Sequence, residues 1–146
     1  MITGIDGTAP VVVRRDLVVG APPRRVWQLL TEVSSWPHWQ PDISAAAAEL
    51  PLGADSTFRW STGGLDIEST VYALRPPRRI LWGGTAHGIT GIHLWTLDAV
   101  GPSTHVRTEE SWDGDPVRAD VDGMREALGA SLEAWLGHLG RAAESS

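Results

Sequence analysis

Hydrophobic and polar positions follow one pattern over the middle of the chain and another near its end. Residues 11–19 are rich in β-branched side chains and predict a strand that stops at Gly20. Between residues 43 and 112, strand-like runs alternate at close intervals with turn residues, which is typical of antiparallel hairpins. From Asp120 to Ala142, apolar residues recur every three or four positions and predict one helix, about 35 Å long at 1.5 Å per residue. Its apolar residues are Val121, Met124, Leu128, Leu132, Trp135 and Leu139.

Prolines mark two short helices between the first strand and the hairpins. Pro22 and Pro23 open the first helix, where the N–H that proline lacks would have no partner. The segment 34–41 combines a pair of serines with two prolines and allows only another brief helical turn. The expected order is one strand, two short helices, six strands and a long helix. The whole chain is expected to form a single domain over residues 1–146, with a flexible tail at 1–9 and a frayed end at 143–146.

Turn residues also place the central strands in register, provided that the turns fall at the tips and the apolar residues share one face. The turns are Gly63-Gly64, His87-Gly88 and the loop 100–103. Alternate residues of the last strand should then face solvent, namely His105, Arg107, Glu109 and Ser111. The predicted pairs are Trp60 with Ile67, Phe58 with Ser69, Gly84 with Gly91, Trp82 with His93, Ile80 with Trp95, Leu97 with Val106, Trp95 with Thr108, and His93 with Glu110.

This register predicts a row of Trp82, His93 and Glu110 across three neighbouring strands. Directly opposed residues have Cβ atoms roughly 4.5–5.5 Å apart, so imidazole and carboxylate can form a hydrogen bond. A histidine held by a carboxylate is a candidate base. The carboxylate would raise the pKa of the imidazole and desolvation would lower it, and the sequence does not decide between them. The alternative is a buried polar pair that only satisfies itself.

Two neighbouring features bear on this row. Gly84 and Gly91 leave a gap without side chains beside Trp112, and a pair of glycines within strands commonly marks a bend or a close approach. Arg15 alternates with the apolar residues of the first strand, so it is placed to face inward and pair with Glu110; as a snorkelling edge residue it would have no such role. His38 and His87 fall at predicted turns and are expected at the surface.

Tryptophan dominates the aromatic composition, with eight in 146 residues beside one Phe and one Tyr. Because the eight are spread over nearly every predicted element, several should converge on one interior and leave a lined, incompletely filled space. The alternative is that they simply fill core volume. The predicted ligand-binding residues are Arg15, Phe58, Trp60, Ser69, Trp82, Gly84, Gly91, Trp95, Thr108, Trp112, Met124, Leu128 and Trp135.

Composition excludes several kinds of chemistry. The chain has no Cys and no Lys, which rules out a thiol nucleophile and a Schiff base. No group of His and acids has zinc-site spacing, and no Gly-rich phosphate loop follows a strand. The formal net charge of −6 disfavours nucleic acid as a partner. No apolar run approaches the ~18 residues of a membrane span. We expect a cytoplasmic protein, monomeric or homodimeric, without metal or organic cofactor.

Four segments carry a resemblance to a known family. They are 19–30, which reads VGAPPRRVWQLL, 36–39, which reads WPHW, 75–82, which reads RPPRRILW, and 104–112, which reads THVRTEESW. Together they resemble the START-like helix-grip (SRPBCC) superfamily, in particular its polyketide cyclase/dehydrase and lipid-transport group. The resemblance implies an α+β helix-grip fold, in which a curved antiparallel seven-stranded sheet wraps around a long C-terminal helix and encloses an elongated hydrophobic cavity.

Members of that superfamily include aromatic polyketide cyclases, carriers of lipids or hormones, and co-chaperone-like proteins. The leading hypothesis is that the chain binds a hydrophobic, aromatic or polyketide-like molecule and promotes its cyclisation or dehydration, with His93 as proton acceptor and Glu110 orienting it. Such cyclases are thought to use Arg, Tyr and Asn in the cavity, whereas this chain has no Asn and Tyr72 is expected to face outward. The alternatives are a non-catalytic carrier or sensor, in which the pair anchors a ligand, and a protein-binding module.

Overall fold

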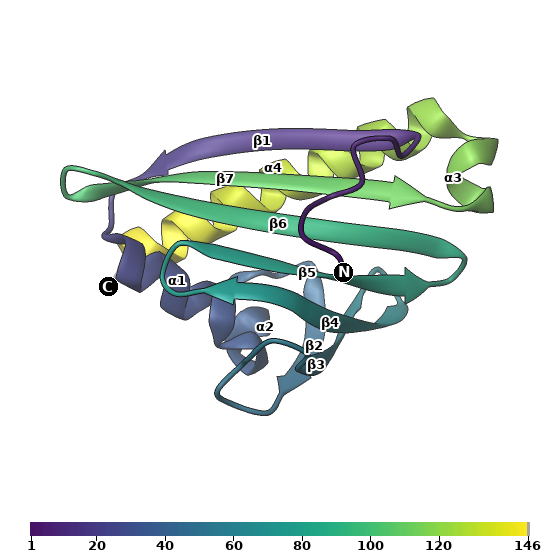
Figure 1. The fold of residues 1–146 in the computed structure, drawn as a ribbon. Coiled ribbons are helices and arrows are strands. Elements are labelled where there is room, and N and C mark those ends of the chain that lie inside the picture. The colour runs from purple at the N-terminus through teal and green to yellow at the C-terminus, as the bar shows by residue number, and fades with distance from the viewer. Residues whose placement is uncertain (146) are drawn as a thin grey trace.

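One antiparallel sheet of seven strands, in the order β1-β7-β6-β5-β4-β3-β2, curves around a long helix (Figure 1). The fold is that of a computed structural model, which describes residues 1–145. It confirms the expected helix-grip architecture of the α+β class. The strands are β1 (Val11–Val19), β2 (Ile43–Ala48), β3 (Thr57–Thr62), β4 (Leu65–Arg75), β5 (Arg79–Ala86), β6 (Ile89–Val100) and β7 (Ser103–Asp113).

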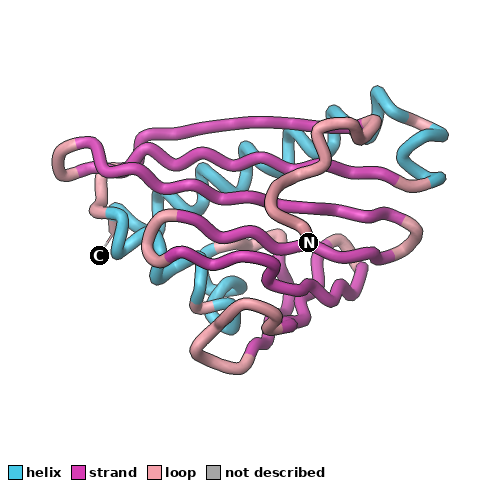
Figure 2. The backbone as a smooth tube through the Cα atoms, in the orientation of Figure 1, coloured by secondary structure: helices cyan, strands magenta, loops and turns pink. Residues whose placement is uncertain are grey.

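The long helix α4 (Val121–Glu144) crosses behind the strands, and the short elements α1 (Pro23–Thr31), η1 (Val33–Ser35) and α2 (Trp36–Trp39) connect β1 to β2 (Figure 2). The N-cap of α4 is Asp120, whose side chain accepts from the Gly123 N–H. The helix continues to Glu144, whose carboxylate accepts the Gly20 N–H at 2.7 Å, and the expected fraying of residues 143–146 stays a prediction. Residue 146, the last of that segment, lies outside the described residues. The short helix α3 (Asp115–Ala119) was not predicted.

All of the predicted strand pairings are present. The turns at Gly63-Gly64 and His87-Gly88 set the β3–β4 and β5–β6 hairpins, and His93 lies opposite both Trp82 and Glu110. The one departure in β4 is a shift of register between Val71 and Ala73, which the alternation did not predict. The row of Trp82, His93 and Glu110 across β5, β6 and β7 is therefore a feature of the fold.

The N-terminal segment changes the expected exposure of β7. It runs over the outer face of the sheet (Figure 1), where the Asp6 N–H donates to Ser111 Oγ at 3.0 Å and Arg79 donates to the Thr3 carbonyl at 2.7 Å. Ser111 is consequently only 1% exposed, so the expectation that it faces solvent is wrong. Residues 1–9 contain no helix or strand, and their flexibility stays a prediction.

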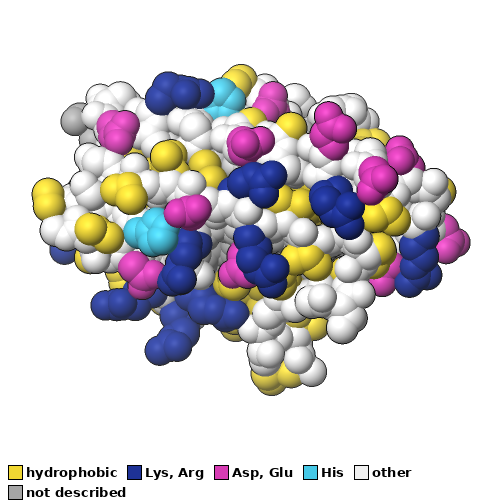
Figure 3. Space-filling model, turned by 90° about the horizontal axis from the view of Figure 1, so that it is seen from above, with side chains coloured by type: hydrophobic (Ala, Val, Ile, Leu, Met, Phe, Trp, Pro, Cys, Tyr) yellow, Lys and Arg dark blue, Asp and Glu magenta, His cyan; other side chains and the backbone are white. Residues whose placement is uncertain are grey.

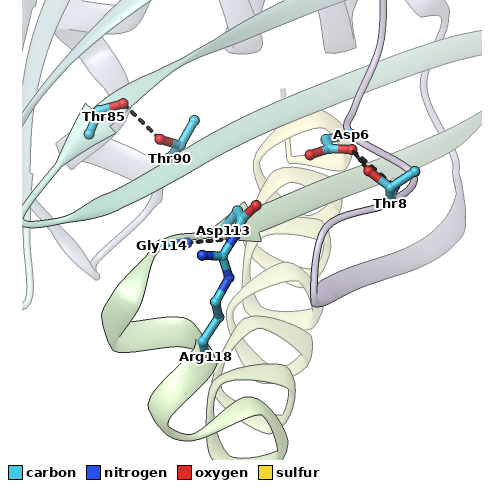
Figure 4. A network of polar contacts seen from close by, with 7 residues as sticks. All are labelled: Asp6, Thr8, Thr85, Thr90, Asp113, Gly114 and Arg118. Carbon is cyan, nitrogen blue, oxygen red and sulfur yellow. Dashed lines mark hydrogen bonds and ion pairs between the residues drawn. The ribbon is translucent and has the colours of Figure 1, made fainter.

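Hydrogen bonds and an ion pair hold the strands and α3 together at the end of the sheet where α3 lies (Figure 4). Asp113 Oδ1 accepts the Gly114 N–H at 2.7 Å and pairs with Arg118 at 2.9 Å, which ties α3 to the end of β7. Thr85 and Thr90 share a hydrogen bond of 2.8 Å across the β5–β6 hairpin. The conformation of Gly114, with φ 135°, suits glycine, because a Cβ there would overlap the Gly88 carbonyl oxygen.

Apolar side chains form two separate clusters between the sheet and α4. The larger one lies toward α1 and α2 and includes the fully buried Trp36, Phe58 and Trp95. The smaller one lies toward α3 and includes Val13 and Leu128. The buried core between the sheet and α4 is therefore divided into two parts.

Charged side chains of both signs are intermixed on the face shown in Figure 3. Several charged side chains of the protein form exposed ion pairs, such as Arg14 with Glu109 at 2.7 Å and Arg107 with Asp98 at 2.6 Å. Exposed pairs of this kind each contribute about 1 kcal/mol or less to stability. Among residues 1–145, no helix is long and apolar enough to span a membrane.

Candidate functional site

A cavity of about 250 Å³ lies between the two apolar clusters. For comparison, an apolar cavity of about 150 Å³ is enough to hold benzene. The mouth is marked by exposed residues from three places, namely Leu65 at the β3–β4 turn, His87 at the β5–β6 turn, and Ser131 on α4. Nine of the predicted site residues line the cavity: Trp60, Ser69, Trp82, Gly84, Gly91, His93, Glu110, Trp112 and Trp135.

Five other predicted binding residues lie behind the wall rather than on it. Phe58 and Trp95 are buried in the larger apolar cluster, and Leu128 is buried in the smaller one with Met124 packed against it. Thr108 is fully buried beneath His93. The prediction placed them on the correct face of the sheet or helix but wrongly in the lining of the cavity, since a pattern of alternation does not distinguish the wall of a cavity from the residues packed behind it.

Arg15 does not pair with Glu110, and that prediction is wrong. In the register of β1 with β7, Arg15 lies opposite Thr108, while Glu110 lies opposite Val13. The Arg15 side chain extends over α4 toward solvent, with its Nε 3.9 Å from Glu133 Oε1. It is therefore the snorkelling edge residue that was the alternative.

Eleven lining residues were not predicted. Thr62, Leu65 and Ile67 follow the same alternation as Trp60 and Ser69, so the register contained the signal that would have found them. His87 is exposed, as expected, yet it lies at the mouth of the cavity. Ala86 and Ile89 likewise follow the alternation of Gly84 and Gly91 on β5 and β6. The register gave no signal for the others: Gln40 and Asp42 before β2, Ile43 at the start of β2, Gly83 on β5 and Ser131 on α4.

Four side chains form a chain of polar contacts at the inner wall. His93 Nδ1 lies 3.2 Å from Glu110 Oε1, and His93 Nε2 lies 2.7 Å from Thr108 Oγ1. The indole N–H of Trp112 donates to Glu110 Oε2 at 2.7 Å. The side chain of Glu110 is 16% exposed and that of His93 only 5%, so the carboxyl group is the more accessible member of the pair.

Desolvation decides the question of charge that the sequence left open. The imidazole of His93 packs against the rings of Trp82, Trp95 and Trp135, with centroid distances of 5.1, 5.0 and 6.1 Å. Burial lowers the pKa of His93 to about 3, so the ring is neutral at physiological pH. Burial also raises the pKa of Glu110 to about 7, against the opposing effect of the hydrogen bond from Trp112.

A neutral imidazole next to a carboxyl group is compatible with both ionisation states of Glu110, which differ by one proton. When Glu110 is ionised, the tautomer with a proton on Nδ1 faces the carboxylate, and Nε2 accepts from the Thr108 hydroxyl. When Glu110 is protonated, the other tautomer turns an unprotonated Nδ1 toward the carboxyl group, and Nε2–H donates to Thr108. The groups facing one another across the 3.2 Å contact are complementary in both forms, so the carboxyl group can gain or lose a proton.

The raised pKa of Glu110 predicts a specific dependence of stability on pH. Below pH 4.5, the ordinary value, the carboxyl group is protonated in both the folded and the unfolded chain. As the pH rises through about 7, the unfolded chain ionises first, and the folded state loses stability of the order of 3 kcal/mol. Glu110→Gln removes this loss and leaves the contribution of His93 in place. Urea unfolding at pH 4 and pH 8 should show the variant gaining stability relative to wild type only at pH 8; an equal difference at both pH values would contradict the shift.

The glycines beside the cavity should differ in their tolerance of a methyl group. A Cβ on Gly83 would overlap the Gly91 carbonyl oxygen, whereas a Cβ on Gly91 would lie 3.4 Å from the Trp112 ring and 3.6 Å from Glu110 Oε2. Gly83→Ala should therefore cost about 1–3 kcal/mol. Gly91→Ala should stay within about 1 kcal/mol of wild type and place its methyl group in the cavity. Chemical unfolding of both variants checks the contrast, and equal losses would show that Gly91 does not face open space.

Comparisons with known proteins agree with this architecture. One curated relative, the oxopyrrolidines biosynthesis cluster protein O of Penicillium oxalicum, is 28% identical over 124 residues, covering 67% of this chain and 60% of the relative's length. The fold is similar to that of a START superfamily protein from Mycobacterium smegmatis, with a TM-score of 0.76, 16% identity, and coverage of 92% of this chain and 97% of that one. It is also similar to the Zhui aromatase/cyclase from Streptomyces sp. R1128, with a TM-score of 0.73, 21% identity, and coverage of 91% and 93%.

The sequence itself matches a family over most of its length. The sequence model described as polyketide cyclase/dehydrase and lipid transport matches residues 10–144, which include every strand, every helix and all of the residues that line the cavity. The earlier resemblance is thereby confirmed. The fold is that of START-like helix-grip proteins, and the chain belongs to the polyketide cyclase/dehydrase and lipid-transport family.

Proposed function

We propose that the protein binds a hydrophobic, aromatic or polyketide-like small molecule in its cavity and promotes cyclisation or dehydration of that molecule by general acid–base catalysis. The observation that carries the proposal is Glu110, a carboxyl group with a pKa raised to about 7 that opens into a tryptophan-lined cavity of about 250 Å³. A group whose pKa lies near the working pH can serve as both acid and base. Membership of the family and the similarity to an aromatase/cyclase support the same proposal.

The two members of the pair exchange the roles that the sequence suggested. His93 is too weak a base, because burial lowers its pKa to about 3, and its two ring nitrogens already face Glu110 and Thr108. Glu110 is the more accessible group and has the suitable pKa. We therefore assign the proton transfer to Glu110 and make His93 the positioning residue, which holds Oε1 while Trp112 holds Oε2.

The reaction then follows from ordinary carbonyl chemistry. The Glu110 carboxylate removes a proton from a CH₂ group between two ketones, and the resulting enolate carbon attacks the carbonyl carbon five atoms further along the chain, which closes a six-membered ring. The protonated carboxyl group returns the proton to the new alkoxide. In dehydration, the carboxylate takes the next α-proton and passes it to the departing hydroxyl group, which leaves as water. The apolar walls would hold a flexible chain in a bent conformation, which lowers the entropic part of the barrier.

The proposal can be tested by mixing the purified protein with a short aromatic β-tetraketone, in which this attack closes a six-membered ring, and following the absorbance of the cyclised product. The expected result is a saturable rate above that of the same substrate in buffer, with a maximum near neutral pH. Saturable binding without any increase in rate would overturn the catalytic proposal and favour the second candidate, a carrier or sensor.

The carrier has one specific observation in its favour. His93 Nε2 and Thr108 Oγ1 form a hydrogen bond with each other within the wall, as two polar groups with a purely structural role would also do. In that case Glu110 and Trp112 would anchor a ligand hydroxyl or carbonyl group without turnover. Mass spectrometry under native conditions would then detect an unchanged small molecule bound to the protein as isolated.

A further inference from the structure

The cavity has an uneven distribution of charge. Among the lining residues that the structure describes, the ionisable groups are two carboxyl groups, Glu110 at the inner wall and Asp42 near the mouth, and the imidazoles of His93 and His87. The chain contains 12 basic residues, all of them Arg, yet not one of those in residues 1–145 lines the cavity. A bound anion would therefore meet carboxyl groups and no guanidinium group.

The aromatic walls add to this asymmetry. Four of the lining residues are Trp60, Trp82, Trp112 and Trp135. The face of an indole ring carries partial negative charge, and tryptophan is the aromatic side chain that attracts cations most strongly. The attraction is larger where water is excluded, as it is against a mostly apolar wall.

We infer that the cavity selects its ligands by charge, binding aromatic molecules with a cationic polar group most tightly, neutral ones less tightly, and carboxylates least. The inference rests on the proposed function only in taking this cavity as the binding site. Glu110 would be the residue that determines the specificity, because it is the inner carboxyl group and has no cationic partner among the described residues.

An ammonium group placed at the inner wall would supply that partner. A charged carboxylate in an apolar setting is stable only when it is paired and hydrogen-bonded, and Glu110 already accepts a hydrogen bond from Trp112 and lies 3.2 Å from His93 Nδ1. A ligand carboxylate would instead place a second negative charge beside the first, or require one of the two to bind a proton. A hydroxyl group can hydrogen-bond to either form of Glu110. A ligand with a hydroxyl group should therefore bind less tightly than one with an ammonium group and more tightly than one with a carboxylate.

The preference should depend on pH through the ionisation of Glu110. The titratable groups that share the cavity with it are His93 from β6, His87 from the β5–β6 turn and Asp42 before β2; α4 contributes only Ser131 and Trp135 to the lining. His93 is neutral in this range. The advantage of the cation should therefore be small at pH 6, where Glu110 is mainly protonated, and larger at pH 8.

Three aromatic molecules of nearly equal shape provide the test. Isothermal titration calorimetry at pH 8 would compare 2-naphthylmethylamine, which is protonated, 2-naphthylmethanol, which is neutral, and 2-naphthoate, which is anionic. We expect the amine to bind about tenfold more tightly than the alcohol, and the alcohol about tenfold more tightly than the carboxylate. At pH 6 the advantage of the amine over the alcohol should fall to about threefold or less.

Two variants assign the effect to one carboxyl group. Glu110→Gln should reduce the difference between amine and alcohol to within about threefold and tighten the binding of 2-naphthoate. The matched control is Glu109→Gln, the same change one residue earlier, where the carboxylate faces outward and pairs with Arg14. This control should keep the wild-type ranking at both pH values.

Several results would overturn the inference. It fails if 2-naphthoate binds wild type as tightly as the alcohol does, or if Glu110→Gln keeps the full ranking. Binding of all three molecules without regard to charge would refute the selection alone and leave the proposed function intact. Binding of none of them would refute both, because the cavity would then not accept a small aromatic ligand.

Discussion

Glu110→Gln is expected to slow cyclisation of a β-tetraketone about 10²–10⁴-fold, the contribution that a positioned general acid or base typically makes. Glutamine keeps the size of the side chain and an oxygen that can accept the indole N–H of Trp112, but it cannot transfer a proton. Substrate binding, measured by calorimetry, should change by only a few-fold for a neutral ligand. Initial rates across pH 5–9 at saturating substrate provide the measurement.

Two further variants separate a catalytic role from a structural one. Glu109→Gln should retain the wild-type rate, because that carboxylate lies on the outer face with Arg14. Trp112→Phe keeps an aromatic ring in the wall but removes the donor to Glu110 Oε2, an interaction that lowers the pKa of the carboxyl group. Its loss should move the limb of the pH–rate profile that reports ionisation of Glu110 to higher pH.

The assignment of roles can also fail in a recognisable way. If His93→Gln lost more activity than Glu110→Gln, with both variants folded, the imidazole would be the base after all. If Glu110→Gln left the rate unchanged while the neutral ligand still bound, the pair would have a structural or anchoring role only, and the carrier function would be favoured.

The register of the sheet was predictable because side chains alternate strictly along strands and the turns were short. Gly63-Gly64 and His87-Gly88 each fix one hairpin, and a shift by one residue would have turned every apolar side chain to the wrong face. That constraint was enough to place His93 opposite Glu110 from sequence alone. It was also enough to bring most of the lining tryptophans to the same face.

Depth and solvation were not predictable in the same way. Alternation places Trp95 and Trp60 on one face, but only the packing of α1, α2 and α4 makes the first a core residue and the second a wall of the cavity. The charge state of His93 depends on the rings stacked around it, which no local pattern describes. Ser111 is buried by the N-terminal segment, a contact between residues more than 100 positions apart.

The buried aromatic cluster around Trp36 provides the largest expected effect on stability. Trp36 comes from the short helix α2, is fully buried, and lies 5.2 Å from Trp135 and 5.4 Å from both Phe58 and Trp82, measured between ring centroids. Its indole N–H donates to the Leu30 carbonyl at 3.2 Å. Trp36→Ala should therefore lower the free energy of unfolding by about 3–5 kcal/mol, the usual cost of removing a buried aromatic side chain.

The same substitution should also affect binding, because two of the rings that Trp36 supports, Trp82 and Trp135, line the cavity. Urea unfolding followed by far-UV circular dichroism gives the stability, and calorimetry with 2-naphthylmethanol gives the affinity, which should weaken. Trp27→Ala is the matched control, since Trp27 is only partly buried against the same cluster and does not line this cavity, so its loss should cost less and leave affinity unchanged. A loss below about 1 kcal/mol for Trp36→Ala would mean that the aromatic cluster does not hold α2 against the sheet. The lining residues Trp82 and Trp135 would then lack the rigid support on which the positioning of a substrate beside Glu110 depends.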